Sequence, residues 1–84
     1  MKDIMFRRAI VNYHVSYVDE DNTHGCYDTT KWLYCDENGK VTEEVCKEWE
    51  NSLKEMETTQ YEKNNALKIK RIGITIISFY KFDV

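Results

Sequence analysis

The stretch "IMFRRAIVNYHVSYV", residues 4–18, decides the fold, because apolar and polar side chains alternate along it. In a strand, successive side chains point to opposite faces of the sheet. The pattern therefore predicts a long strand with one covered face and one face in water. The face predicted to be covered carries Ala9, Val11, Tyr13, Val15 and Tyr17, and the other face carries Arg8, Asn12, His14 and Ser16.

The next two segments predict that this strand forms a hairpin with a second one. Residues 19–25, "DEDNTHG", are poor strand formers that end in a glycine, whereas residues 26–35, "CYDTTKWLYC", return to β-branched and aromatic types. Two such runs joined by a short polar loop are typical of a hairpin. Within the second run Trp32 and Leu33 are adjacent, so they cannot share a face of the sheet.

A turn and an amphipathic helix are predicted to follow. Asn38 and Gly39 give a turn signal because both residue types tolerate positive φ. Thr42 is the expected N-cap, with Glu43 and Glu44 in the first turn, where the helix dipole favours negative charge. Apolar residues then recur at steps of three and four, which predicts a helix over residues 43–57 with one core-facing stripe. The stripe consists of Val45, Cys46, Trp49, Leu53 and Met56.

The last part of the chain predicts a connection and a further long strand. Residues 58–65 are the expected connection, and residues 66–82, "ALKIKRIGITIISFYKF", the strand. Leu67 and Ile69 share one parity, whereas Ile72 and the isoleucines after it share the other. A strand changes parity only with an extra residue, so we expect a bulge or bend near Lys70–Gly73. Because both faces of the following segment are apolar, we expect this strand to be central in the sheet, with the first strand and a second protomer as its neighbours.

Together these segments predict one α+β domain over residues 1–84: a small antiparallel sheet in β-β-α-β order with one amphipathic helix packed on one face. A chain of 84 residues is long enough for one small core. No apolar run approaches the about 20 residues that cross a bilayer. Charged residues lie near the N-terminus, where a signal peptide has an apolar run, so a cytoplasmic location is expected.

Residues 18–28, "VDEDNTHGCYD", raise the question of a metal site. A calcium loop that begins at Asp19 needs glycine at its sixth position and glutamate at its twelfth, but His24 and Thr30 stand there. A soft-metal site would have to draw on His14, His24, Cys26 and Cys35, whose spacing matches no known zinc pattern. A small metal-dependent enzyme is therefore the third functional hypothesis.

The remaining catalytic signals are weak as well. The neighbours of Cys26 are aspartates, which disfavour a reactive thiolate. The three glycines are not clustered, so no phosphate cradle is indicated. We therefore expect no catalytic residues and no cofactor. The three cysteines, Cys26, Cys35 and Cys46, cannot all pair within one chain, and we expect buried free thiols.

Charge is unevenly distributed along the chain. Residues 19–62 contain thirteen acidic residues and four lysines, whereas residues 63–84 contain five bases and one acid. The net charge of the whole chain is −3. Because the terminal strands are expected to be neighbours, a basic cluster of Arg7, Arg8, Lys68, Lys70 and Arg71 is expected at one end of the sheet.

This charge pattern favours a non-catalytic protein-binding or inhibitor protein that occupies a basic surface of a partner. Small inhibitors encoded by phages and mobile elements often have this size and charge and occupy a nucleic-acid groove of an enzyme. The alternative hypothesis is a nucleic-acid-binding module that uses basic and aromatic residues of the terminal strands, although the acidic pI of 5.3 disfavours it. The residues expected to bind the partner are Asp19, Glu20, Asp21, Asp36, Glu37, Glu43, Glu44, Glu48, Glu50, Glu55 and Glu57.

A sheet with a single helix also leaves one face uncovered. An exposed patch of Tyr17, Trp32, Ile77 and Phe79 is expected there. A second copy of the chain or a partner protein is expected to cover it.

Overall fold

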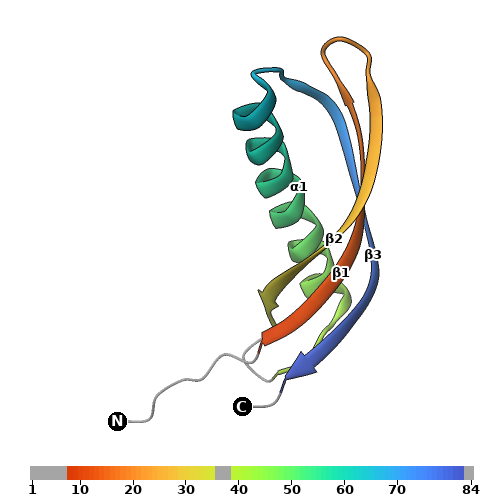
Figure 1. The fold of residues 1–84 in the computed structure, drawn as a ribbon. Coiled ribbons are helices and arrows are strands. Elements are labelled where there is room, and N and C mark those ends of the chain that lie inside the picture. The colour runs from red at the N-terminus through yellow and green to blue at the C-terminus, as the bar shows by residue number, and fades with distance from the viewer. Residues whose placement is uncertain (1–7, 36–38, 83–84) are drawn as a thin grey trace.

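The computed structural model describes residues 8–35 and 39–82. These residues form β1 (Arg8–Asp19), β2 (His24–Tyr34), α1 (Glu43–Asn65) and β3 (Ile69–Phe82). The three strands make one antiparallel sheet, and α1 lies along one of its faces (Figure 1). The predicted fold class and the predicted β-β-α-β order are confirmed.

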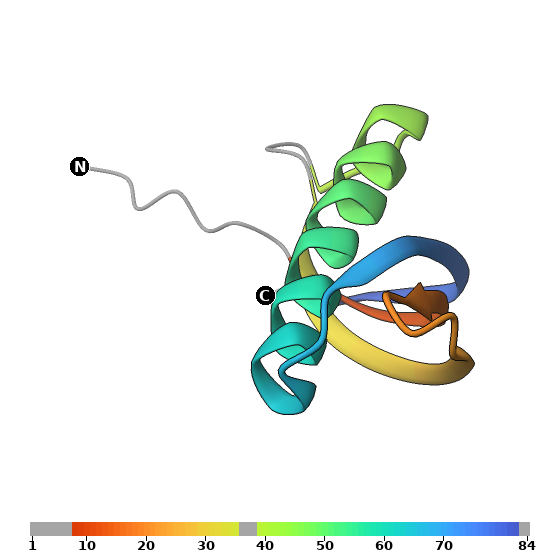
Figure 2. The ribbon, with the colours of Figure 1, turned by 90° about the horizontal axis from the view of Figure 1, so that it is seen from above.

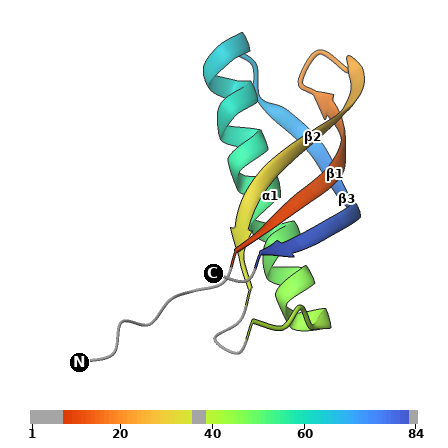
Figure 3. The ribbon, with the colours of Figure 1, turned by 60° about the horizontal axis from the view of Figure 1, so that its bottom comes forward.

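The first strand, not the last, occupies the centre of the sheet. The strand order is β2-β1-β3, so β1 pairs with both neighbours and β3 is an edge strand (Figure 3). Within one chain β3 is therefore not central, whereas the predicted pairing of the terminal strands is confirmed, and the second protomer expected on the other side of β3 stays a prediction. The alternation in β1 was read correctly, because Ala9, Val11, Tyr13 and Val15 are all fully buried.

Two register shifts between β1 and β3 explain why both faces of β3 look apolar. Val18 pairs with Arg71 and Asp19 with Ile69, so Lys70 is an extra residue on β3. This shift falls within the predicted interval. A second shift, not predicted, leaves Ile77 as an extra residue farther along β3. Each extra residue moves the following side chains to the other face, so no single parity holds along the strand.

The helix is eight residues longer than predicted. Thr42 caps its N-terminus as expected, because its Oγ1 accepts a hydrogen bond from the Val45 amide at 3.3 Å. The segment expected to be a connection, residues 58–65, continues α1 instead. The inward-facing stripe goes on at four-residue steps through Glu57 and Tyr61. An apolar pattern does not reveal this continuation, because both side chains are polar.

Ala66 ends the helix in the left-handed region, with φ of 53°, and its amide donates to the Glu62 carbonyl at 3.1 Å. Alanine is strained there because its Cβ crowds the backbone, whereas glycine is not. We therefore expect Ala66→Gly to stabilise the protein by about 0.5–1 kcal/mol. Urea denaturation measures the change, and Ala9→Gly, in the extended backbone of β1, is the control expected to destabilise. A destabilised Ala66→Gly variant would contradict this account of the cap.

Figure 2 shows α1 lying over one face of the sheet, and the core residues of both layers meet between them. Val45, Trp49 and Leu53 from the helix are buried there, and the Trp49 Nε1 donates to the Tyr34 carbonyl at 2.8 Å. Met56, predicted to complete the stripe, is 38% exposed, and Glu57 is buried in its place.

Candidate functional site

The residues expected to bind a partner fall into four groups. Asp36 and Glu37 lie outside the described residues. Glu20 and Asp21 are exposed at the turn of the β1–β2 hairpin, and Glu43, Glu44, Glu48, Glu50 and Glu55 lie along α1. Asp19 and Glu57 are the fourth group, and they are buried, with exposed fractions of 1% and 6%.

Asp19 and Glu57 are therefore not part of an exposed acidic surface, contrary to the expectation for them. Their carboxylates accept hydrogen bonds from tyrosines of this same chain, so they are directed into the molecule. Sequence composition cannot separate a buried carboxylate from an exposed one, because the distinction depends on the donors that the fold brings to it.

The hairpin turn does not join the glutamates at the start of the helix into one acidic surface. The Glu20 amide donates to the Lys68 carbonyl at 2.8 Å, and the Glu20 Oε1 accepts from the Lys68 amide at 3.1 Å. These bonds hold the turn beside the segment that follows the C-terminus of α1 (Figure 1). The turn and the helix N-terminus thus lie at opposite ends of an elongated molecule, whose longest dimension is 51 Å.

The glutamates on the helix form two rows of different character. Glu43, Lys47, Glu50 and Lys54 alternate in sign along one row, at steps of three and four residues. Pairs at these steps neutralise one another locally. The second row has no lysine: Glu44, Glu48 and Glu55 lie within about 40° of one another around the helix axis, and all three are exposed. We call Glu44, Glu48 and Glu55 the acidic stripe.

The predicted basic cluster does not form. Arg8 pairs with Phe82 at one end of the sheet, whereas Arg71 pairs with Val18 near the other end. The antiparallel pairing of β1 and β3 requires this separation. Arg7 lies outside the described residues. Lys68 and Lys70 stay beside Arg71, so the basic residues are divided between the two ends.

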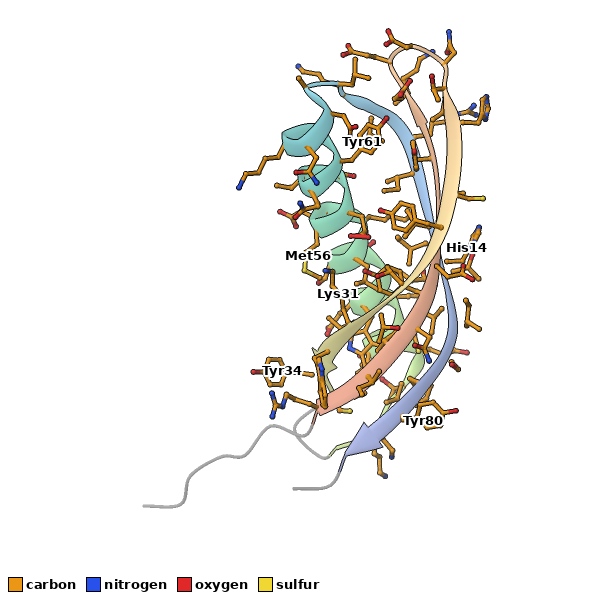
Figure 4. All side chains as sticks on the ribbon, in the orientation of Figure 1. His14, Lys31, Tyr34, Met56, Tyr61 and Tyr80 are labelled. Atoms are coloured by element: carbon orange, nitrogen blue, oxygen red, sulfur yellow. The ribbon has the colours of Figure 1, made fainter. Side chains whose placement is uncertain are left out.

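A group of tyrosines and carboxylates joins the C-terminal half of α1 to the sheet. The Tyr27 hydroxyl donates to Glu57 Oε1 at 2.9 Å, and the Tyr61 hydroxyl donates to Asp19 Oδ2 at 2.8 Å. Tyr17 packs between them, with its ring centroid 4.7 Å from that of Tyr61 and 6.3 Å from that of Tyr27. Figure 4 shows Tyr61 between the helix and the sheet. We call these five residues the tyrosine–carboxylate network.

The other oxygen of Asp19 orders the hairpin turn. Asp19 Oδ1 accepts from the amides of Asp21 at 2.9 Å and Thr23 at 3.0 Å. The hydrogen bond from Tyr61 lowers the pKa of Asp19 and raises the pKa of Tyr61 to about 12. Asp19 is therefore a charged acceptor at neutral pH, and it fixes both the turn and the end of the helix.

Burial also raises the pKa values of Tyr13 and Tyr27, and the Glu57 carboxylate adds to both shifts. Their hydroxyls therefore remain protonated at neutral pH, and Tyr27 serves as a donor. The Tyr13 hydroxyl is buried without a hydrogen-bond partner in the described part of the chain. This arrangement holds the C-terminal half of the helix on the sheet. The four-residue spacing of Leu53, Glu57 and Tyr61 was the only feature of the sequence that indicated the tyrosine–carboxylate network.

The face of the sheet away from the helix has a polar middle. Asn12 accepts from the Thr30 hydroxyl at 2.7 Å and donates to Ser78 Oγ at 3.0 Å, which links all three strands. One step along β1, His14 Nδ1 lies 2.6 Å from Asp28 Oδ1. Figure 4 shows His14 on the side of the sheet away from α1. The middle of this face is therefore suited to contact with water, not to packing against a second layer of protein.

One end of the same face is apolar and aromatic. Ile10 pairs with Trp32 on β2 and with Tyr80 on β3, and the Arg8 guanidinium lies 5.2 Å from the Trp32 ring centroid. Trp32 is 53% exposed and Tyr80 is 66% exposed.

Three of the four residues of the predicted exposed patch are exposed: Trp32, Ile77 and Phe79. Tyr17, however, belongs to the tyrosine–carboxylate network. Phe79 is 38% exposed while its ring packs edge-on against Trp49, with ring centroids 5.6 Å apart.

The residues considered for a soft-metal site are not gathered in one place. His14 is engaged by Asp28, His24 lies at the start of β2, and Cys35 follows its far end. Within residues 8–35 and 39–82, no three histidine, cysteine or acidic side chains are arranged to hold a metal ion. The three cysteines form no disulfide, as expected, but only Cys35 is buried, and Cys26 is exposed.

The described part of the chain contains no helix with the length and apolar character needed to cross a membrane. No protein-family model matches the chain, and neither a curated protein nor a solved structure is significantly similar to it.

Proposed function

We propose that this protein is a non-catalytic binding protein, which uses the acidic stripe of α1 to occupy a basic surface of a partner protein. The observation that carries the proposal is the separation of charge on the helix. Lysines accompany the glutamates of the alternating row, whereas Glu44, Glu48 and Glu55 stand exposed without a lysine between them.

The acidic stripe places like charges side by side on the helix, although Glu44 also lies in the first turn, where the helix dipole favours negative charge, and three residues before Lys47. Glu44 and Glu48 are four residues apart, where like charges destabilise a helix by about 0.2–0.5 kcal/mol. A lysine at position 48 would turn that repulsion into an attraction to Glu44. A concentration of negative charge is favourable when a partner has a complementary positive potential. That complementarity speeds the encounter of the two proteins and selects against other partners.

The packing of the opposite side of the helix also makes the acidic stripe suitable for recognition of a partner. Val45, Trp49 and Leu53 fix the opposite side of the helix in the core. The stripe therefore holds its carboxylates in a line about 16 Å long with little freedom to lose on binding. A rigid row of negative charge resembles a short piece of nucleic-acid backbone in its electrostatics. A nucleic-acid-binding groove on a partner enzyme is accordingly the proposed target.

The alternative is a nucleic-acid-binding module, and one observation favours it. Arg8 stacks on Trp32 beside the exposed Tyr80, and single-stranded nucleic acids bind such aromatic and basic surfaces. The division of the basic residues between the two ends of the sheet disfavours a continuous phosphate track. We therefore place the protein partner first.

The test compares two charge-neutralised variants in binding to the host protein recovered by pull-down and then purified. Glu44→Gln/Glu48→Gln/Glu55→Gln removes the acidic stripe, and Glu43→Gln/Glu50→Gln is the control in the alternating row. At low salt we expect the first variant to bind about 10–100-fold more weakly and the control to bind within about threefold of the wild type. Circular dichroism checks that both remain folded.

Equal binding by both variants would contradict the proposal, as would affinity for the partner that does not fall with added salt. Retention of the wild-type protein on heparin or single-stranded DNA, lost in Trp32→Ala, would support the nucleic-acid alternative instead.

A further inference from the structure

A hollow of about 550 Å³ lies on the open face of the sheet, near the hairpin end. Its lining comes from all three strands and includes Ser16, Val18, His24, Arg71 and Gly73. No residue of α1 lines it, so it opens on the side away from the helix. The volume is in the range of small-molecule sites. The hollow is therefore distinct from the acidic stripe, and a ligand bound in it would add a second activity to the proposed function.

Gly73 leaves the floor of the hollow open. It lies inside β3 opposite Ser16, and its backbone is not in the left-handed region, so φ does not require glycine. A Cβ built on Gly73 would meet Ser16 Oγ at 3.1 Å, a contact that a small movement of the hydroxyl relieves. Glycine weakens the interior of a strand, and it often marks a place where a ligand approaches closely.

Gly25, the other glycine of the lining, has a different explanation. A Cβ on Gly25 would run into the ring of Tyr17, whose position is fixed by the tyrosine–carboxylate network. Packing therefore accounts for Gly25, and no packing contact of this kind accounts for Gly73.

The chemistry of the lining suits a negative ligand. Val18 pairs with His24 on one side and with Arg71 on the other, so an imidazole and a guanidinium flank the hollow. Ser16 adds a hydroxyl beside Gly73. Among the residues that the structure describes, no acidic side chain lines the hollow. Within residues 8–35 and 39–82 no carboxylate pairs with Arg71, which leaves its fork of donors available.

We propose that this hollow binds the anionic group of a small organic molecule, a carboxylate or a phosphate. Arg71 binds the anion through its planar fork of N–H donors. His24 approaches from the other side, and the Ser16 hydroxyl contacts it from the floor. Val18 supplies an apolar side chain to the lining.

Nuclear magnetic resonance tests the site on the full chain. Amide and arginine side-chain resonances are followed while inorganic phosphate, acetate or chloride is added at constant ionic strength. We expect phosphate or acetate to cause saturable shifts at residues 16–18, 24–26 and 71–73, and chloride to cause none. The titrations with phosphate and with acetate distinguish the two types of anion. The anion with the lower dissociation constant identifies the preferred group.

Three variants make the test specific. Arg71→Gln removes the fork and is expected to weaken binding at least tenfold. Gly73→Val fills the floor and is expected to abolish binding, and Gly73→Ala is expected to weaken it. As a control, Lys68→Gln, at an exposed position three residues before Arg71, removes the same charge and is expected to change affinity less than threefold.

Shifts that do not saturate, or that appear equally at all basic residues, would overturn the site. Unchanged affinity in folded Arg71→Gln and Gly73→Ala would overturn it as well. Binding to the protein partner of the acidic stripe is a separate measurement, so the two proposals fail independently.

Discussion

Replacing Leu53 by alanine is expected to destabilise the protein by about 2–5 kcal/mol. Leu53 is fully buried at the middle of α1, where the helix packs on the sheet. Truncation to alanine removes the free energy gained by transferring the leucine side chain from water to the core. It also leaves a cavity between the helix and the sheet. In a domain of this size that loss is a large part of the total stability. Urea denaturation, monitored by circular dichroism, measures the change in the free energy of unfolding.

Met56→Ala is the matched control for Leu53→Ala. Met56 was predicted to share the core-facing stripe, but it is 38% exposed on the helix (Figure 4). Partial exposure leaves less apolar area to lose, so we expect a cost below about 1.5 kcal/mol. If Met56→Ala were as damaging as Leu53→Ala, the assignment of the buried helix face would be wrong.

Replacing Asp19 by asparagine is expected to destabilise the protein at neutral pH, in a way that disappears in acid. The Asp19 carboxylate accepts from Tyr61 and from the amides of Asp21 and Thr23. Asparagine is of similar size but lacks the charge that strengthens these bonds. The expected result is a lower free energy of unfolding, with earlier loss of the hairpin turn and of the last turn of α1. Urea denaturation between pH 2 and 7 measures it.

The sign of the pH dependence follows from the lowered pKa of Asp19. A group whose folded-state pKa is depressed contributes stability that is fully present above its unfolded pKa, about 3.9 for aspartate. That contribution is lost as the pH falls through the lower folded pKa. The difference between the wild type and Asp19→Asn should thus be constant from about pH 5 to 7 and shrink below about pH 4.

Asp21→Asn provides the control for this measurement. It makes the same chemical change two residues away, at an exposed position of the same turn. We expect it to leave the free energy of unfolding within about 0.5 kcal/mol of the wild type. A pH-independent difference between the wild type and Asp19→Asn would show that the Asp19 charge does not stabilise the fold.

One of the two candidate sites could be predicted from the sequence, whereas the other required the tertiary structure. The acidic stripe follows from sequence, because helical spacing alone places Glu44, Glu48 and Glu55 together. The hollow at Gly73 does not, because its lining comes from three strands. The sequence predicted a bulge or bend near Lys70–Gly73, and the structure has the register shift at Lys70, within that interval, with Gly73 in a paired part of the strand. The prediction of a basic cluster failed for a related reason, since antiparallel pairing separates Arg8 from Arg71.

Local spacing in the sequence was enough to establish the separate elements: the alternation of β1, the hairpin, the Thr42 cap and the helical stripe through Leu53. Each of these depends on neighbours within a few residues, where spacing fixes direction. The fold was needed to establish that β1 is central, that α1 runs on to Asn65, and that Asp19 and Glu57 are buried. Those outcomes depend on contacts between distant segments, such as Tyr61 with Asp19, and local patterns carry no information about which polar group will find a partner.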